Sequence, residues 1–364
     1  MFTTHSSFHP VRWAAVILVT VPVVLLAAAL VASLTQQKEV AHAIRHLLRY
    51  PLVAESSLVL LLALWGIIYE RANKARDLRL YPPPGKLIPM GGYRLHLYCT
   101  GEGSPTVVLE HGLDGSYLDW RLVQPEIAHL TRVCSYDRAG YGWSDRSPKP
   151  RVPSAMVEEL HMLLRNGGEK PPFIVVGHSM GAFDAVMYSH RYPDEVGAIV
   201  LVDGPYPDKP LGFPWREKLE LRFMQLTSPF GLPRWRRWCA GGPDGLRAIR
   251  AAVNCKARVH GTHYEQLLNF PSAVAEMQSL ENFLTLPLIV ISRDPLVGGD
   301  SLKEQEWAER QKKLLQLSSN STQVIADGSR HDVPGQRPDV IIDVVRRLVE
   351  RMRQPAQGQI VRPH

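Results

Sequence analysis

Cysteine is scarce in this chain and never falls in the C-x-x-C spacing of zinc sites and redox motifs. The four cysteines of the 364 residues are Cys99, Cys134, Cys239 and Cys255, and they lie far apart in sequence. This pattern indicates neither a zinc site nor the dense disulfide scaffold of a small secreted domain. We expect buried free thiols, with a Cys239–Cys255 disulfide as the alternative in an oxidising compartment.

The chain has fewer acidic than basic residues, and half of the difference lies near the N-terminus. Its 42 Lys and Arg against 35 Asp and Glu give a net charge of +7. Residues 1–80 hold 8 of the basic and 4 of the acidic residues, which leaves 34 against 31 for residues 81–364. Residues 81–364 are so close to electrical neutrality that they lack the basic surface that binds nucleic acid, so no nucleic-acid partner is expected.

Charge is absent altogether from Trp13 to Gln37, where Ala, Val and Leu dominate. As a helix this run reaches ~37 Å at ~1.5 Å per residue, enough to cross a hydrocarbon core of ~30 Å. A cleaved signal peptide has a shorter apolar stretch and a more basic start than Arg12 alone provides. We therefore predict an uncleaved membrane anchor, with the lipid bilayer as a partner.

A second apolar run, Ser56 to Tyr69, reaches the length of a span only when it is extended back to Pro51, past Glu55. A helix on the membrane surface and a second span over residues 51–69 both fit this pattern. The run is followed by four basic residues, Arg71, Lys74, Arg76 and Arg79. By the positive-inside tendency they favour the cytoplasmic side for the rest of the chain.

Beyond residue 81, short β-rich runs alternate with helical patterns. Strands are expected at Tyr93–Cys99, Thr106–His111, Arg132–Asp137, Pro172–Gly177, Ala198–Asp203, Pro287–Ser292 and Thr322–Asp327. The first of these alternates polar and apolar residues, as an antiparallel edge strand does, whereas the others are runs of the kind found in buried strands. This alternation predicts an α/β fold with a mostly parallel sheet covered by helices on both faces.

Residues 205–286 interrupt the alternation with Pro, Trp and helical pieces, which predicts a helical cap inserted into the core. The predicted parts are an anchor region 1–80, a core in two parts (81–204 and 287–353), the cap 205–286 and a tail 354–364. The cap is rich in aromatic residues, among them Trp215, Phe223, Phe230, Trp235 and Trp238. Pocket lining, packing on the core and membrane contact all remain open for them.

The segment Gly177-His178-Ser179-Met180-Gly181 lies between an apolar strand and a helical pattern. A nucleophilic serine on a sharp strand-to-helix turn needs small neighbours, because backbone and helix approach closely there. The glycines on either side provide that room. The start of the helix also contributes positive potential for an oxyanion.

Partners for this serine follow other predicted strands. The loop after the strand at Thr106 offers the Leu113 N–H as an oxyanion donor beside the Met180 N–H. His331 lies in a loop after the last strand and is the candidate base. Asp203 and Asp294 each follow a buried strand, where a carboxylate orients such a base. His111 and His178, next to glycines in tight loops, are expected to be structural.

These motifs, in this order, resemble those of the α/β-hydrolase fold superfamily over residues 86–353. The segment Tyr136–Asp145 is also similar to a loop of that family. The resemblance implies Ser179 as nucleophile, His331 as base and Asp294 as acid, because members usually carry the acid after the penultimate strand. The usual glycine before that acid is missing here, so Asp203 stays the alternative acid.

The expected activity is therefore that of a membrane-anchored serine hydrolase that cleaves a fairly apolar small-molecule ester, like a carboxylesterase or lipase, without a metal or organic cofactor. Amide or peptide, thioester and carbon–carbon bond hydrolysis use the same triad, as does acyl transfer. A non-catalytic binding module of the same fold is a further alternative. Epoxide hydrolases and dehalogenases resemble versions with Asp at the elbow, so Ser179 argues against both. The sequence leaves the oligomeric state open.

Overall fold

The computed structural model describes residue 30 and residues 38–208, 213–241, 244–280, 284–297 and 301–354. These residues fall into two compact units, one ending at Tyr69 and one starting at Glu70. The predicted anchor at 13–37 lies outside the described residues, apart from Leu30.

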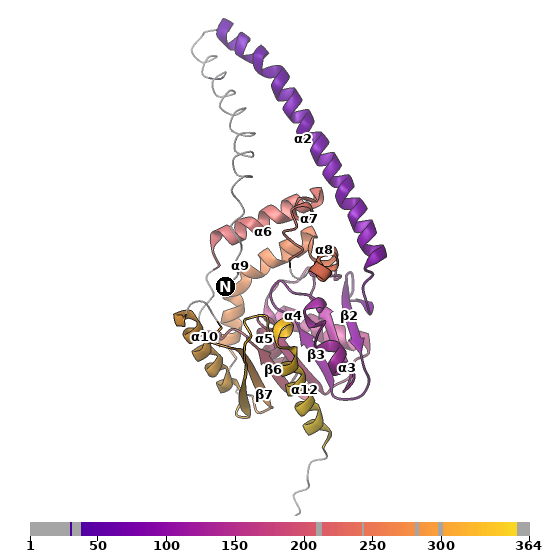
Figure 1. The fold of residues 1–364 in the computed structure, drawn as a ribbon, viewed down its shortest axis with the longest axis vertical. Coiled ribbons are helices and arrows are strands. Elements are labelled where there is room, and N and C mark those ends of the chain that lie inside the picture. The colour runs from indigo at the N-terminus through magenta and orange to yellow at the C-terminus, as the bar shows by residue number, and fades with distance from the viewer. Residues whose placement is uncertain are drawn as a thin grey trace, which may run out of the picture. The chain divides into compact units, whose positions relative to one another are not determined.

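The first unit contains most of helix α2 (Lys38–Leu80), drawn in indigo in Figure 1. Among the described residues, Val53–Leu80 is the one helix that is long and apolar enough to cross a bilayer. Large apolar side chains of this segment, such as Leu60, Trp65 and Ile68, are exposed. The second apolar run is therefore part of a longer continuous helix, which continues past Tyr69 into charged residues.

The second unit is built on an eight-stranded sheet with the order β1-β2-β4-β3-β5-β6-β7-β8. The strands are β1 (Lys86–Pro89), β2 (Arg94–Thr100), β3 (Thr106–Glu110), β4 (Val133–Asp137), β5 (Phe173–His178), β6 (Val196–Val202), β7 (Leu288–Arg293) and β8 (Ser321–Ala326). All seven predicted strands are confirmed. The strand β2 is antiparallel, as expected, but it pairs with both β1 and β4, so its expected place at the edge is wrong and β1 lies outside it.

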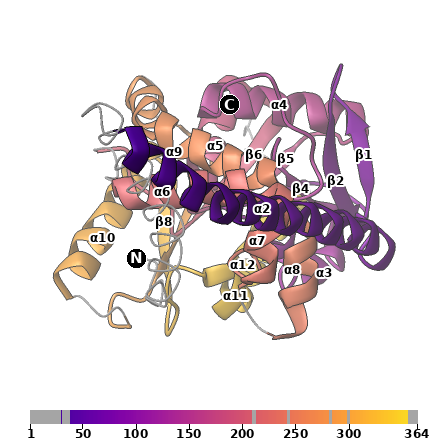
Figure 2. The ribbon, with the colours of Figure 1, turned by 90° about the horizontal axis from the view of Figure 1, so that it is seen from above.

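Helices cover both faces of the sheet. Figure 2 shows α4 (Pro153–Gly167) and α5 (Gly181–Arg191) on one face, and α3 (Gln124–Ala128) and α12 (Pro338–Arg353) on the other. Successive strand residues such as Val107 and Val108 belong to the two opposite core layers. Because side chains alternate between two buried faces, the central strands β3, β5 and β6 are largely apolar. The predicted α/β fold with a mostly parallel sheet is confirmed.

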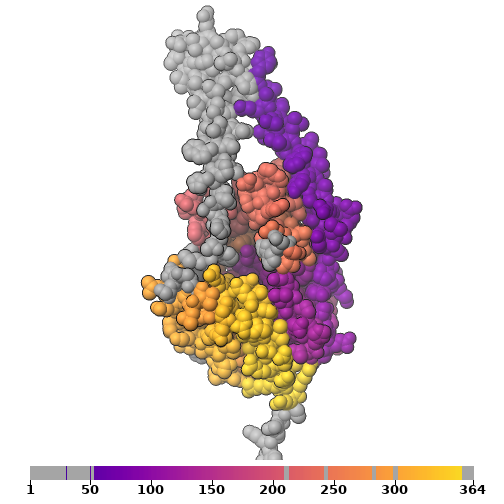
Figure 3. All heavy atoms as spheres, in the orientation of Figure 1, coloured from indigo at the N-terminus to yellow at the C-terminus, as the bar shows by residue number. Residues whose placement is uncertain are grey.

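The segment between β6 and β7 forms a set of helices. They are α6 (Trp215–Thr227), α7 (Leu232–Trp235), α8 (Arg247–Asn254) and α9 (Ala257–Gln278). The long helix α9 packs on the core, where the Phe270 ring stacks 6.2 Å from Phe183 of α5. Figure 3 shows these cap segments, in salmon and orange, at one end of the second unit and α12, in yellow, toward the other.

The remaining helices are short or border the last two strands. They are α10 (Ser301–Leu314), α11 (Val333–Gln336) and the 3-10 turns Tyr117–Trp120, Pro193–Glu195, Ser228–Phe230, Asp244–Leu246 and Leu315–Leu317.

All four cysteines are paired in disulfides, Cys99–Cys134 and Cys239–Cys255. The expectation of free thiols is therefore wrong, and the cap disulfide weighed as its alternative is present. The pair Cys99 and Cys134 lies 35 residues apart but directly opposed in the antiparallel register of β2 and β4. That register is a property of the sheet and leaves no trace in the cysteine spacing.

Candidate active site

Ser179 lies on a tight turn between β5 and α5. Its φ of +52° is in the left-handed region that residues other than glycine rarely adopt. A Cβ on Gly177 would lie 2.2 Å from the Gly181 carbonyl oxygen, and one on Gly181 would lie 2.7 Å from that of Glu110. The close approach expected from the sequence is present, and any larger residue at either glycine would push this turn apart.

His331 joins this serine to a buried carboxylate. Its Nε2 lies 2.9 Å from Ser179 Oγ, and its Nδ1 lies 2.6 Å from Asp203 Oδ2. Asp203 follows β6, has no exposed surface and also has a positive φ, +46°. An ionised Asp203 accepts the Nδ1–H, which leaves the Nε2 lone pair facing the serine hydroxyl. This is the arrangement in which an imidazole takes the proton of a nucleophile.

The expected contact between Asp294 and His331 is wrong. The carboxylate of Asp294 accepts hydrogen bonds from the backbone N–H groups of Leu296 (2.8 Å) and Gly328 (2.9 Å). These bonds lower the pKa of Asp294. Because Asp294 stands one residue beyond the end of β7, its side chain closes its own turn and supports the loop that leads to His331. The neighbouring Arg293 is the residue that reaches the buried carboxylate.

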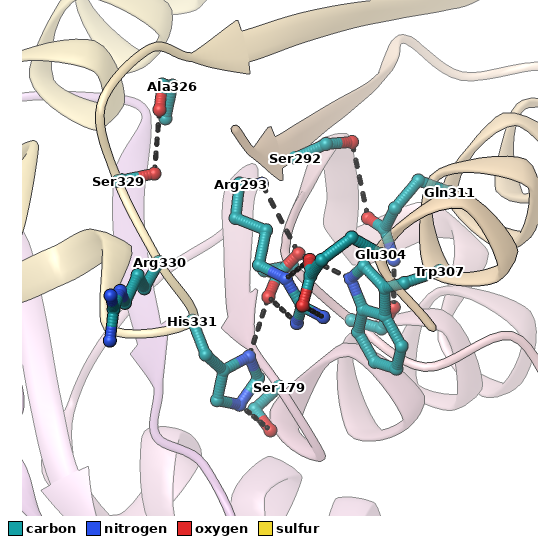
Figure 4. A network of polar contacts seen from close by, with 12 residues as sticks. Ser179, Ser292, Arg293, Glu304, Trp307, Gln311, Ala326, Ser329, Arg330 and His331 are labelled. Carbon is teal, nitrogen blue, oxygen red and sulfur yellow. Dashed lines mark hydrogen bonds and ion pairs between the residues drawn. The ribbon is translucent and has the colours of Figure 1, made fainter. Parts of the chain in front are cut away.

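Asp203 accepts hydrogen bonds from three different segments. The donor residues, His331, Arg293 and Trp307, are labelled in Figure 4. Besides the imidazole, it accepts hydrogen bonds from Trp307 Nε1 (2.7 Å) and Arg293 Nη1 (3.0 Å). Burial acts to raise the pKa of Asp203, but the bond and charge of His331, the Arg293 guanidinium and the Trp307 N–H outweigh it and lower this pKa. Glu304 in turn binds Arg293 through both oxygens. Asp203, Arg293 and Glu304 therefore form a row of alternating negative and positive charges that begins beside the imidazole.

The loop after β3 lies against Ser179. A Cβ on Gly112 would lie 3.3 Å from the Ser179 Cβ, so the adjoining Leu113 is near Ser179 as well. Met180, the second expected donor, is the N-cap of α5. Buried Arg138 holds the loop, because its guanidinium donates to the carbonyls of His111 (2.6 Å) and Gly112.

Two histidines near Ser179 hold loops in place. Burial, with the charge of His331 second, lowers the pKa of His178 to about 4, so its ring is neutral near pH 7. Its Nε2–H donates to the His331 carbonyl at 2.8 Å. In His111, Nε2 accepts a hydrogen bond from the backbone N–H of Arg138. The proton of the ring is therefore on Nδ1, which donates to the Gly112 carbonyl. These contacts are of the structural kind expected for both residues.

The described residues contain one group with ligand atoms close enough together for a metal ion, Cys99, Cys134 and Glu169. Its two sulfurs are joined in a disulfide, and Glu169 is paired with Arg132. A disulfide offers no thiolate, so this group does not suit a metal.

Three residues near the site escaped sequence reasoning: Arg138, Arg293 and Trp307. Arg138 and Arg293 had a usable signal, since each is a cation at the end of an apolar strand. Trp307 had none, because it reaches Asp203 from α10, more than a hundred residues further along the chain.

A sequence model of the family described as alpha/beta hydrolase fold matches residues 105–330. The chain belongs to this family. An uncharacterised protein of Bacillus subtilis, YbdG, is 23% identical over 239 residues, which cover 65% of this chain and 74% of that protein. The human (lyso)-N-acylphosphatidylethanolamine lipase is 34% identical over 113 residues, 30% of this chain and 31% of the lipase.

Solved structures agree on the fold. The enol-lactonase from Burkholderia xenovorans LB400 superposes with a TM-score of 0.55 at 20% identity, covering 73% of this chain and 100% of the enzyme. Membership of the family, together with the hydrolases related to it, supports a hydrolase.

Proposed function

We propose that this alpha/beta hydrolase is a membrane-anchored serine hydrolase that cleaves esters through an acyl-enzyme on Ser179. The base is His331, and the acid is Asp203 in place of the expected Asp294. The observation that carries the proposal is the continuous contact from the Ser179 hydroxyl through the imidazole to a buried carboxylate, at the ends of β5, β8 and β6.

In the proposed reaction, Ser179 Oγ attacks the ester carbonyl carbon while His331 Nε2 takes its proton. Asp203 stabilises the imidazolium that forms, and the Leu113 and Met180 N–H groups bind the oxyanion. The intermediate collapses when the imidazolium gives its proton to the departing alcohol, which leaves the acyl group on Ser179. Water then attacks the acyl carbon and passes its proton to His331, and release of the acid returns a proton to Ser179.

Two observations support an apolar, lipid-like ester as the substrate class. Val53–Leu80 has the length and the exposed apolar surface of a membrane helix. The related human protein is a lipase that acts on N-acylphosphatidylethanolamine, by its name. An enzyme held at a bilayer meets such esters at high local concentration.

The disulfides bear on the side of the membrane. Disulfides are rare in the cytosol and persist in oxidising compartments. The two bonds therefore favour the non-cytoplasmic side for the catalytic part, against the cytoplasmic side favoured by the basic residues after Tyr69. We give the disulfides more weight, because a charge bias only shifts the balance between two orientations.

A fluorophosphonate probe tests the serine mechanism. The full-length chain should be labelled at Ser179, and Ser179→Ala should lose both the label and the hydrolysis of p-nitrophenyl esters while keeping its circular dichroism spectrum. A series of esters with increasing acyl length, beside amide and thioester analogues, defines the reaction. An unlabelled, inactive wild type would instead indicate a binding module.

A further inference from the structure

Helix α6 of the cap carries large apolar side chains on the side that faces away from the core. Trp215, Leu219, Phe223 and Leu226 are exposed by 69%, 59%, 42% and 60%, whereas Leu221 is buried. The four exposed residues follow one another at intervals of four, four and three, so they share one face of the helix. We call them the cap stripe.

The cap stripe continues onto α7 through an aromatic cluster. The ring of Phe223 lies 6.3 Å from that of Trp238, and the Arg236 guanidinium lies over the rings of both Trp238 and Trp235. Trp235 is itself exposed. Single exposed apolar residues are ordinary, but a contiguous set of large ones marks an interaction surface.

This surface is tied to the end of the apolar segment of α2. Arg234, next to Trp235, is buried, and its Nε lies 2.9 Å from Glu70 Oε2 while its Nη2 lies 2.8 Å from Asp77 Oδ2. Glu70 directly follows Tyr69, the last residue of the apolar run, and belongs to the same compact unit as the cap. The cap is thus fastened to the point where the chain leaves its apolar segment.

We propose that the cap stripe and Trp235 dock into the surface of the bilayer that α2 anchors. This rests on the proposed membrane anchoring and extends it to the catalytic part. Asp77 is seven residues after Glu70, ~10 Å along a helix, so Arg234 is held within the ~5–7 Å headgroup layer or just outside it. Tryptophan is enriched at that depth in membrane proteins.

The charge around the cap stripe fits the same partner. Residues 213–241 carry six basic and two acidic side chains, and Arg216, Arg222 and Arg237 are exposed. An apolar helix face flanked by basic residues binds at the headgroup–acyl boundary and is attracted to anionic lipids where the leaflet contains them. A lipid ester would then pass from the bilayer to the cap without crossing water.

The activity test uses the full-length chain in phosphatidylcholine vesicles, with and without phosphatidylserine. Trp215→Ser/Leu219→Ser should hydrolyse a long-chain ester dissolved in the vesicles about tenfold more slowly, because two apolar side chains no longer insert. Hydrolysis of a short water-soluble p-nitrophenyl ester should stay unchanged. The matched control is Leu122→Ser/Leu302→Ser, which removes two exposed leucines outside the cap and should alter neither rate. Equal rates of the stripe variant and wild type on vesicles would overturn the proposal.

A second measurement does not depend on catalysis. Lipids brominated on their acyl chains quench the fluorescence of tryptophans that contact them, and Trp215→Phe/Trp235→Phe should remove a clear part of this quenching. Unchanged quenching would overturn the proposal. It is the result expected if a second copy of the chain, and not the bilayer, covers the cap stripe. Failure of the ester proposal appears separately, as a wild type inactive on the soluble ester. If the anchoring proposal fails, a carbonate wash releases the protein from the vesicles. The cap stripe can then still be tested, by adding vesicles of brominated lipid to the released protein and measuring the quenching of its tryptophans.

Discussion

Replacing Asp203 by Asn should cost this enzyme most of its activity, and the reason lies in the number of donors around the carboxylate. Oδ2 accepts from His331 and the Arg293 guanidinium, while Oδ1 accepts from Trp307 Nε1 and the Arg293 backbone N–H. An asparagine has one oxygen and one NH2 group. Whichever way the amide is turned, its NH2 faces a pair of donors, and two hydrogen bonds are lost.

The expected loss in kcat for Asp203→Asn is about 10⁴-fold, as for the equivalent change in a serine protease. This corresponds to about 5 kcal/mol of transition-state stabilisation. A neutral side chain no longer stabilises the imidazolium, and an NH2 opposite Nδ1 favours the tautomer whose Nε2–H points at Ser179. The assay is kcat and kcat/KM on a soluble p-nitrophenyl ester, with circular dichroism and the thermal midpoint as checks on folding.

The matched variant is Asp294→Asn. Its carboxylate binds only backbone N–H groups near the surface, and the amide oxygen of an asparagine can keep one of these bonds. We expect a loss within about threefold, through small displacement of the loop before His331. Near-normal rates for Asp203→Asn together with a severe loss for Asp294→Asn would refute this reasoning and return the acid to β7.

Three further predictions follow from the same contacts. Arg293→Gln should lower kcat about tenfold without unfolding the chain, because the acid keeps its imidazole and indole partners but loses a charged one; an unchanged kcat would contradict this. The pKa of His178 falls from its ordinary 6.5 to about 4 on folding. As the pH falls, His178 is therefore protonated in the unfolded chain before it is protonated in the folded one, and the free energy of unfolding should decline by about 3 kcal/mol between about pH 6.5 and about pH 4. The thermal midpoint of His178→Gln should decline less steeply with pH than that of wild type. Parallel curves would refute this. Maleimide–polyethylene glycol should modify no cysteine of the unfolded, unreduced chain and all four after dithiothreitol; modification at Cys99 or Cys134 without reductant would remove the argument for an oxidising compartment.

The centre of the sheet could be predicted because β3, β5 and β6 are buried on both faces and therefore appear as largely apolar runs. The strand β1 escaped because it has four residues, of which only Ile88 is buried. A segment so short and exposed differs little in composition from a loop, and only its pairing with β2 defines it.

The contact between Ser179 and His331 could be predicted because each residue has a local sequence context, a glycine-flanked turn for Ser179 and a late loop for His331. The carboxylate that contacts His331 could not be predicted, because Asp203 and Asp294 have the same local context, a position directly after an apolar strand. Which of them reaches the imidazole depends on where the side chains at the strand end point. At the end of β7, the side chain of Arg293 points toward the site and that of Asp294 does not. The Cys99–Cys134 bond escaped for a similar reason, since it depends on which residues of two strands stand opposite each other.

The insertion of the cap between β6 and β7 has a consequence for how this protein acquires activity as it folds. Ser179 and Asp203 follow β5 and β6, which are neighbours in sequence, but His331 follows β8, which reaches the sheet only through β7. Pairing of β7 with β6 requires closure of a loop of more than eighty residues, a contact of long sequence separation that forms slowly. Recovery of hydrolase activity after denaturation should therefore trail the recovery of helical and strand signal, with the imidazole as the last part of the site to arrive.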